Sequence, residues 1–338
     1  MIPDASFAEQ LRGITEASKT VAARIEELTG RHVSPVFRRY YLSDPANQAE
    51  HIRHGHDCAE SIVGQSPLDH TKIAQWIWLQ EDGECHCCTD GLWGNRYGQL
   101  WQGDPELKLR GNAADLTEKA LERMSQSLLS AGGRLSDHCL RTWFMVRDID
   151  VNYPGVVAAR NKVFAKSGLT TESHFIASTG IGAYHRDPSQ TVSFNAFADL
   201  TLSSADITYL KGRSHLNPTA EYGVAFERAT ATGYPCHREV LVSGTASIDS
   251  KGMIVAPGDI LAQTERMTEN IEVLLSEGGC GFSDLAHLIV YLRDISDYKA
   301  VDNYFASRLP DVPRLIVHAP VCRPGWLVEA ECMAIKAR

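Results

Sequence analysis

The sequence has no concentrated run of basic residues. Its 33 lysines and arginines are outnumbered by 42 aspartates and glutamates, which gives a formal net charge of −9, and no five consecutive residues are all Lys or Arg. Because binding to nucleic acid requires a concentrated basic surface, nucleic acid is not expected as a partner. An acidic chain can still bind an anionic small molecule through two or three local arginines.

The sequence also lacks an apolar segment long enough to span a bilayer. Residues 1–20 do not show the basic and then apolar pattern of a secretory signal. The nine cysteines are odd in number and irregularly spaced, so a disulfide framework is not expected. Together these absences predict a cytoplasmic protein with reduced thiols and no membrane partner.

The chain contains an internal duplication. Glu122-Arg123-Met124 and Glu265-Arg266-Met267 each begin a helical stretch that continues through a glycine pair and a Ser-Asp pair into a strand ending in Arg-Asp-Ile. The offset between the copies is 143 residues at the first match, 147 at Ser-Asp and 146 at Arg-Asp-Ile. A nearly constant offset predicts two copies of one domain, and two domains are also expected for a chain of 338 residues.

Each copy is predicted to have the element order ββαβαββ, and an amphipathic helix over residues 7–28 precedes the first copy. A helix that crosses between strands of one sheet indicates an α+β fold, in which a mixed sheet carries its helices on one face. We therefore expect tandem duplicated domains. The predicted boundaries are an N-terminal helix at 1–30, a first domain at 31–202, a linker at 203–222 and a second domain at 223–338.

Motifs in the second half resemble the RidA (YjgF-like) family. In chain order they are Val242-Ser243-Gly244-Thr245-Ala246-Ser247, Gly258-Asp259, Gln263, Asn270, Val290-Tyr291-Leu292-Arg293-Asp294, Pro313-Arg314 and Val328-Glu329-Ala330-Glu331. The resemblance implies a chorismate-mutase-like α+β unit. It also implies assembly as a trimer, with the site in the cleft between neighbouring units.

Two such units in one chain, with the catalytic end on the second, resemble the chorismatases, and this resemblance covers roughly Asp137 to the end. The further similar segments are Arg141-Thr142-Trp143, Thr179-Gly180-Ile181-Gly182-Ala183, Tyr222-Gly223 with Phe226 and Arg228-Ala229, and Cys322-Arg323 with Leu327-Val328-Glu329. Chorismatases remove pyruvate from chorismate. Within that family, a glycine and a cysteine at the positions of Gly244 and Cys322 accompany formation of 3-hydroxybenzoate, whereas alanine there accompanies simple hydrolysis.

Glu329 is the candidate proton donor. Chorismate carries an enol ether, and cleavage requires protonation of its terminal methylene carbon, which gives an oxocarbenium ion that water or an internal hydroxyl traps. A carboxylic acid whose pKa is raised by burial suits that step. Strand alternation places Glu329 and Glu331 on one face, and the alternative is that both face water on an outer strand. In the first half, Asn195 lies near the place of Glu329, and His174 lies near that of Arg314.

Three arginines are candidates for holding the substrate. A guanidinium binds a carboxylate through two parallel hydrogen bonds, and in the RidA family the arginine that corresponds to Arg314 binds the substrate carboxylate. Chorismate has two carboxylates, so a second cation is needed. Arg228 and Arg141 are the candidates for that cation. For each of the three arginines, the alternative is an ordinary ion pair with an acidic neighbour.

Cys322 and Gly244 are singled out by their positions in the chorismatase-like motifs. Cys322 lies seven residues before Glu329, and a thiol of moderate pKa there would suit the movement of a ring proton. The alternative is an inert buried thiol. Gly244, on a predicted strand, leaves room for substrate, or it marks a bulge or close packing.

Tyr222 and Gly180 complete the candidate site. Tyr222 donates a hydrogen bond to a substrate oxygen, or it is a core aromatic residue with its hydroxyl at the surface. Gly180 lies in a predicted glycine turn over residues 179–183, after a predicted strand over residues 174–178. Backbone N–H groups of such a turn can meet an anion, and the alternative is a plain tight turn.

Cysteine and histidine gather in the first half of the chain. Cys85-His86-Cys87-Cys88 follows a group composed of His51, His54, His56 and Cys58. These residue types suit zinc, but Cys-x-Cys-Cys is not a usual zinc spacing, and no second Cys-x-x-Cys pair follows. A loop of reduced thiols and histidines is the preferred interpretation. Neither a metal nor a cofactor is therefore predicted.

The expected function is that of a chorismatase-like enzyme acting on a small carboxylate. One alternative is a RidA-type enamine or imine deaminase that uses Arg314 and Glu329 with a bound water. Another is a non-catalytic carboxylate-binding protein of a biosynthetic cluster. We expect one working cleft per chain, where Gly180 faces the C-terminal strands of the second half. The chain is a monomer or a homo-oligomer, and the third position of the ring is empty, filled by N-terminal structure or supplied by another chain.

Overall fold

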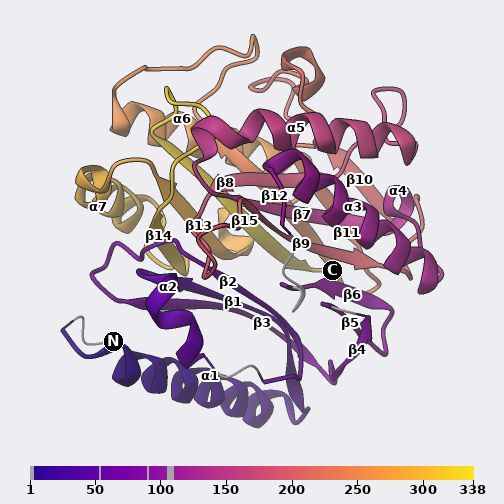
Figure 1. The fold of residues 1–338 in the computed structure, drawn as a ribbon, viewed down its shortest axis with the longest axis vertical. Coiled ribbons are helices and arrows are strands. Elements are labelled where there is room, and N and C mark those ends of the chain that lie inside the picture. The colour runs from indigo at the N-terminus through magenta and orange to yellow at the C-terminus, as the bar shows by residue number, and fades with distance from the viewer. Residues whose placement is uncertain (1–3, 53–54, 90, 105–109) are drawn as a thin grey trace.

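The computed structural model describes residues 4–52, 55–89, 91–104 and 110–338. Its described strands form three sheets, one of three strands and two of six strands. Figure 1 shows the long helices on the outside of the molecule and the sheets facing one another in its middle. The largest buried apolar cluster includes residues from all three sheets.

The N-terminal unit is a helix packed on the three-stranded sheet, at the bottom of Figure 1. It comprises α1 (Phe7–Thr29), β1 (Val33–Leu42), α2 (Pro45–Gln48), β2 (Ala59–Val63) and β3 (Ile73–Glu81). Strand β1 is central, parallel to β2 and antiparallel to β3. Ser6 and Glu9 form a capping box at the start of α1. The helix predicted over residues 7–28 is therefore confirmed.

The first repeat is a six-stranded sheet covered by two long helices. Its strands, in sheet order, are β4 (Cys85–Thr89), β5 (Leu92–Asn95), β6 (Gln99–Gln102), β9 (Val192–Asp199), β7 (Cys139–Val146) and β8 (Ala177–Gly182). Its helices are α3 (Ala113–Ser130), α4 (Leu135–His138) and α5 (Ile149–Lys166). Asn112 caps α3 by accepting a hydrogen bond from the backbone of Asp115.

The second repeat is built in the same way. Its strands, in sheet order, are β10 (Ile207–Leu210), β11 (Ala229–Gly233), β12 (His237–Ala246), β15 (Val328–Ala337), β13 (Leu285–Leu292) and β14 (Arg314–His318). Its helices are α6 (Ile260–Glu277) and α7 (Tyr298–Arg308). Short 3₁₀ helices are η1 (Ala49–His51), η2 (Thr219–Tyr222), η3 (Phe282–Asp284) and η4 (Ile295–Asp297).

The two six-stranded sheets have the same strand order, position by position. In each, the strand after the first long helix is parallel to its outer neighbour, β7 with β8 and β13 with β14. Strands β7 and β13 begin at residues 139 and 285, which is an offset of 146 residues. The predicted α+β fold with a duplicated domain is therefore confirmed.

Two predicted boundaries differ from the structure. Residues 33–81, which we placed in the first domain, contain the strands of the separate N-terminal sheet. The predicted linker at 203–222 contains β10, which pairs with β11 and belongs to the second sheet. The reason is the same in both places. Alternation and residue type predict a strand, but only tertiary pairing decides which sheet it joins.

The predicted turn over residues 179–183 is part of strand β8. Its glycines serve close packing instead of a turn. A Cβ on Gly180 would lie 2.7 Å from the ring of Tyr153, and one on Gly182 would lie 2.7 Å from the backbone oxygen of Pro320. Gly182 also donates a backbone hydrogen bond to Pro320, at 2.9 Å, which joins the two repeats. Glycine lets two backbones approach this closely.

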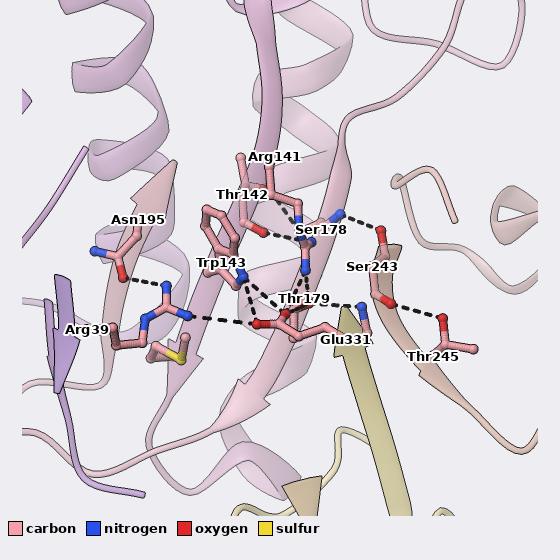
Figure 2. Close-up of polar contacts among 12 residues, drawn as sticks. Arg39, Arg141, Thr142, Trp143, Ser178, Thr179, Asn195, Ser243, Thr245 and Glu331 are labelled. Carbon is pink, nitrogen blue, oxygen red and sulfur yellow. Dashed lines mark hydrogen bonds and ion pairs between the residues drawn. The ribbon is translucent and has the colours of Figure 1, made fainter. Parts of the chain in front are cut away.

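Glu331 connects the three sheets through its buried carboxylate (Figure 2). The side chain is 3% exposed. From the first repeat, Arg141 donates to it at 2.6 Å and the indole of Trp143 at 3.0 Å, and the hydroxyl of Thr179 also donates to it. From the N-terminal sheet, a guanidinium nitrogen of Arg39 lies 3.9 Å away. The chain thus places one anion where all three sheets meet.

Arg39 on β1 meets equivalent positions of both repeats. Its other terminal nitrogen donates to the amide oxygen of Asn195 at 3.1 Å. Asn195 lies opposite Trp143 in the first sheet, and Glu331 lies opposite Ile289 in the second sheet. Because residues 143 and 289 are related by the offset of 146, Asn195 and Glu331 occupy the same place in their repeats. The N-terminal sheet therefore packs against both repeats at one shared point.

Replacing Glu331 by Gln is expected to lower the free energy of unfolding by about 3–5 kcal/mol, because Arg141 and Arg39 remain buried without their anion. Urea denaturation followed by circular dichroism measures the change. The control is Glu269→Gln, which removes a half-exposed partner of Arg266 and is expected to cost less than about 1 kcal/mol. Equal losses in the two variants would contradict the central role of Glu331.

Candidate active site

A cavity lies between the two repeats, on the side of β15 that faces β8. It contains about 510 Å³ of space, open solvent included. Its lining residues are Tyr153, Arg160, Ser178, Gly180, Tyr222, Val224, Phe226, Arg228, Gly244, Ala246, Ile248, Cys322, Arg323, Trp326 and Glu329. Six of the eight predicted site residues therefore come together here, and they come from both halves.

Glu329 is the buried carboxyl of this cavity. It lies on β15 between Ala246 of β12 and Tyr291 of β13, and it is 5% exposed. Burial raises the pKa of Glu329 to about 8, and the nearby Glu331 carboxylate adds to the increase, against the opposing effect of Arg141 and Arg228. Glu329 is therefore largely protonated at neutral pH, which is the form that an acid catalyst needs.

Gly244 makes room for that carboxyl. A Cβ at this position would lie 2.1 Å from Oε1 of Glu329, so any side chain here requires the glutamate to move. The register of β12 against β15 shifts between Val242 and Thr245, which places Gly244 in an irregular part of the strand. Its N–H donates to the hydroxyl of Thr179 at 2.9 Å. The two interpretations of Gly244 are thus compatible, because the irregular part of the strand is also the place where the missing side chain leaves room for Glu329.

Arg228 supplies one buried positive charge. It is 5% exposed, and one terminal nitrogen donates to the backbone oxygen of Asn217 at 3.0 Å. Its guanidinium lies 5.5 Å from the ring centre of Tyr222 and 5.4 Å from that of Phe226. Its Nε is buried and has no hydrogen-bond partner among the described residues. Burial lowers the pKa of Arg228, and an arginine stays charged at neutral pH nonetheless.

Arg160 is a second buried cation, which the sequence analysis missed. It projects from α5, is 1% exposed, and lies 5.7 Å from the ring centre of Phe226. Its Nε and one terminal nitrogen are buried without a hydrogen-bond partner among the described residues. The sequence did contain a signal for Arg160. At helical spacing it lies on the same face as Val156, Val163 and Phe164, which are buried and apolar. An arginine on such a face needs an anion.

Arg323 is the third cation and is only partly buried. Its guanidinium lies 4.8 Å from the ring centre of Tyr222 and 5.0 Å from that of Trp326. Within the described ranges, none of the three cavity arginines has a carboxylate within 4.0 Å. The cavity therefore combines three cations with one largely neutral carboxyl, so its net charge favours an anionic ligand.

Tyr222 and Cys322 line the same cavity. The ring of Tyr222 lies between the guanidinium groups of Arg228 and Arg323, and burial raises the pKa of its hydroxyl. Burial also raises the pKa of Cys322 to about 12, and Glu329 adds to the increase. The expectation of a thiol with moderate pKa is therefore wrong for this state of the protein. At neutral pH Cys322 is a neutral thiol, which is a poor base.

Arg141 and Arg314, which we predicted as substrate ligands, do not line the cavity. Arg141 is bound to Glu331. Arg314 lies on β14, which is separated from β15 by β13, and its guanidinium pairs with Asp302 of α7 at 2.9 Å. For both residues the alternative of an ordinary ion pair with an acidic neighbour is therefore the one that the structure shows. An arginine after a proline at a strand start matches the family motif, but the motif does not say which cleft the arginine faces.

The strand registers also correct the comparison of the two halves. Arg314 lies opposite Leu288 in the second sheet, and Ser178 lies opposite Thr142 in the first repeat. Thr142 and Leu288 are related by the offset of 146 residues. The residue of the first repeat that corresponds to Arg314 is therefore Ser178 and not His174. By the same count Ser193 takes the place of Glu329, because they lie opposite Met145 and Tyr291. Asn195 matches Glu331 instead. Ser178, which lines the cavity, therefore stands where the arginine motif would be.

None of the described residues in the cysteine and histidine region lines the cavity. Cys85–Thr89 is strand β4, at the outer edge of the first sheet, and His54 lies outside the described residues. Asp57, Cys58 and Glu60 have ligand atoms within 4.8 Å of one another. Arg38 donates to Asp57 at 2.6 Å and to Glu60 at 3.2 Å, so a guanidinium already balances these carboxylates.

Among the described helices, none combines the length and the apolar character needed to cross a membrane.

Comparisons with known proteins agree with this architecture. Residues 225–336 match the family model described as Endoribonuclease L-PSP. A RutC family protein of Pyrococcus abyssi is 32% identical over 101 residues, which are 29% of this chain and 78% of that protein. The 3-aminoacrylate deaminase RutC of Acinetobacter baylyi is 32% identical over 97 residues, which are 28% of this chain and 77% of that protein.

The structure as a whole is similar to a crystal structure of a chorismatase. The TM-score is 0.73 at 21% sequence identity, and the match covers 89% of this chain and 93% of the chorismatase chain. This likeness extends over most of the chain, whereas the RutC relatives match 101 and 97 residues of it. The chain therefore belongs to the RutC family, its family model matches within the second repeat, and its fold over 89% of the chain is similar to that of a chorismatase.

Proposed function

We propose that this protein is a chorismatase-like enzyme that releases pyruvate from chorismate, with Glu329 as the proton donor. The observation that carries the proposal is the pairing of a buried, largely protonated carboxyl with three arginines in one cavity between the repeats. The likeness of the fold to a chorismatase supports it. No step of this proposal uses a metal or a cofactor.

The charges of the cavity favour a substrate with two carboxylates. Arg160 and Arg228 are buried and have unpaired nitrogens, and Arg323 lies at the side of Tyr222. A buried cation without an anion is costly, and a substrate carboxylate removes that cost on binding. Chorismate carries two carboxylates on opposite parts of the molecule. We assign Arg160 and Arg228 as the principal carboxylate ligands, with Arg323 at the edge.

The chemistry follows from the protonation state of Glu329. The carboxyl gives its proton to the terminal methylene carbon, which becomes the methyl group of pyruvate, and a positive charge develops at the ether carbon and oxygen. The carboxylate left behind stabilises that charge. The ring carbon–oxygen bond then breaks and pyruvate leaves. As it leaves, the oxygen of the neighbouring ring hydroxyl bonds to the same ring carbon and gives its proton to the Glu329 carboxylate. Glu329 then protonates this bridging oxygen, whose older bond to the ring breaks, so that the oxygen stays on the carbon that pyruvate left. Loss of the hydrogen from that carbon makes the ring aromatic and restores the Glu329 carboxyl, so chorismate yields pyruvate and 3-hydroxybenzoate without net use of water.

We further propose 3-hydroxybenzoate as the aromatic product. Gly244 and Cys322 are the residues that accompany this product in the chorismatases, and both line the cavity beside Glu329. The glycine sets the position of the carboxyl, and the neutral thiol occupies space that water would need for attack. We therefore assign Cys322 to product choice and not to proton removal.

A deaminase is the second candidate, because a relative is named 3-aminoacrylate deaminase. Its family uses an arginine at the position of Arg314 to hold the substrate. In the described cleft that position is Ser178, and Arg314 is paired with Asp302 on the other edge of the sheet. The cavity thus lacks the deaminase arginine and has other arginines instead, which favours chorismate.

The direct test is incubation of the purified protein with chorismate, with coupled detection of pyruvate and chromatographic identification of the aromatic product. Glu329→Gln is expected to lower kcat by about 10²–10⁴-fold, since the amide cannot donate a proton to carbon. Glu269→Gln, on the exposed side of α6, is the matched control and is expected to keep the wild-type rate. Absence of pyruvate from the wild-type protein, or full activity of Glu329→Gln, would rule the proposal out.

A second test separates the two candidate functions by their arginines. Arg160→Gln is expected to lower kcat/KM for chorismate by roughly tenfold or more, because a charged hydrogen bond to the substrate carboxylate is lost. Arg314→Gln is expected to change kcat/KM less than about threefold. A larger loss in Arg314→Gln than in Arg160→Gln would point to the deaminase-type site. Urea denaturation shows whether either variant is unfolded.

The pH dependence of kcat/KM follows from the pKa of Glu329. The acid form is required, and it is lost as the pH rises through about 8, so kcat/KM is expected to fall above that value. The pKa values of Tyr222 and Cys322 are raised away from this range, so the decrease in kcat/KM above about pH 8 reports the titration of Glu329. Cys322→Ala is expected to show the same decrease in kcat/KM above about pH 8. A profile that is flat between pH 6 and about 10 would show that Glu329 is not the titrating acid.

A further inference from the structure

A second group of reactive side chains lies on the hairpin between β11 and β12. Cys236 is exposed, and its Sγ lies 3.3 Å from Nδ1 of His237. The other ring nitrogen of His237, Nε2, lies 3.1 Å from Oε1 of Glu239. A thiol, an imidazole and a carboxylate are thus joined in that order, which is the arrangement that activates cysteine nucleophiles.

The Glu239 carboxylate holds the imidazole in its charged form. Glu239 is 5% exposed, and its Oε2 is buried with no hydrogen-bond partner among the described residues. A buried carboxylate with one unpaired oxygen strongly favours a cation beside it. The hydrogen bond to Glu239 raises the pKa of His237 to about 9, so the ring is an imidazolium at neutral pH. This positive ring in turn lowers the pKa of Cys236.

The ring of His237 is fixed in place by Tyr234. The two rings are stacked, with centres 4.7 Å apart and planes 14° from parallel. The hydroxyl of Tyr234 lies 3.0 Å from a carboxylate oxygen of Asp199 at the end of β9, which it can reach as a donor. The backbone of Tyr234 also donates to His237 across the turn at 2.9 Å. The imidazole is therefore preorganised between its two partners, while Cys236 remains open to solvent.

We propose that Cys236 is a reactive thiol site that undergoes thiol–disulfide exchange with small-molecule disulfides, with His237 and Glu239 as its positioning partners. The Cys236 thiolate attacks one sulfur of the small disulfide, a new S–S bond forms to the protein, and the old S–S bond breaks. The second half of the disulfide leaves as a thiolate and takes a proton from water. Reduction of the mixed disulfide by excess thiol restores Cys236.

The geometry favours covalent exchange over metal binding. The two nitrogens of His237 face different partners, Cys236 on one side and Glu239 on the other, so the three groups do not converge on one point. The site is also separate from the cavity. Gly244 lies seven residues beyond His237 on the same strand, which is on the order of 23 Å for an extended chain. The inference is therefore independent of the proposed activity on chorismate.

The chain contains its own reference thiols. Cys87 and Cys88 are exposed as well, but the thiol of Cys87 donates to the backbone oxygen of Thr89 at 3.2 Å, and burial raises the pKa of Cys88. Among the described residues, neither thiol has an imidazole partner comparable to His237. Exposure alone thus does not distinguish the three thiols. What distinguishes Cys236 is the pair of His237 and Glu239 beside it.

The experiment treats the reduced full-length protein with glutathione disulfide at pH 7 and follows each cysteine-containing peptide by mass spectrometry. Cys236 is expected to gain glutathione severalfold faster than Cys87 and Cys88 in the same sample. His237→Asn and Glu239→Gln are each expected to slow the reaction at Cys236 severalfold without changing it at Cys87. In urea, the three thiols of the wild-type protein are expected to react at similar rates.

Two results would overturn the inference. One is reaction of Cys236 no faster than that of Cys87 in the folded wild-type protein, a comparison that needs no variant. The other is an unchanged rate at Cys236 in His237→Asn with a wild-type circular dichroism spectrum. Cys236→Ser is expected to abolish the modification at that peptide and to leave the rest of the labelling pattern as it is.

Discussion

The buried carboxylate of Glu331 is the contact on which the arrangement of the three sheets depends. An anion in the interior is stable only if its oxygens are satisfied. Here the hydrogen-bond donors come from β7 and β8 of the first repeat, and Arg39 of β1 adds a positive charge 3.9 Å away. The carboxylate on β15 thus depends on partners from the other two sheets. The Glu331 carboxylate therefore has its full set of partners only when the N-terminal unit and both repeats are packed together. The same contact thus fixes the interface that forms the cavity.

That contact also connects the scaffold with the chemistry. Glu329 and Glu331 are two residues apart on β15 and lie on one face, as strand alternation requires. Glu331 is paired with Arg141 and Arg39, whereas burial and the nearby Glu331 carboxylate raise the pKa of Glu329. Two chemically identical side chains thus have different roles, because one has donors from a neighbouring sheet and the other has an open cavity.

Sequence reasoning predicted the duplication and the fold class, and six of the eight site residues that it singled out line the cavity, because motif spacing fixes strand positions within one repeat. It was wrong for Arg314, because a motif does not say which neighbour a sheet edge meets. It missed Arg160, since an arginine inside a helix carries no motif and becomes meaningful only when its unpaired nitrogens are seen. It mistook the glycines of β8 for a turn, because close approach of two backbones leaves no local signal.

The join between the N-terminal sheet and the repeats bears on how this protein can change over evolutionary time. Gly64 pairs with Tyr184 beyond β8, and Pro67 pairs with Val317 of β14, so the segment that follows β2 is joined to both repeats. In a ring of identical subunits, every substitution alters all the clefts at once. In a fused chain each cleft has its own residues, so Ser178 and Arg314 are free to differ, and one cleft can specialise while another becomes purely structural.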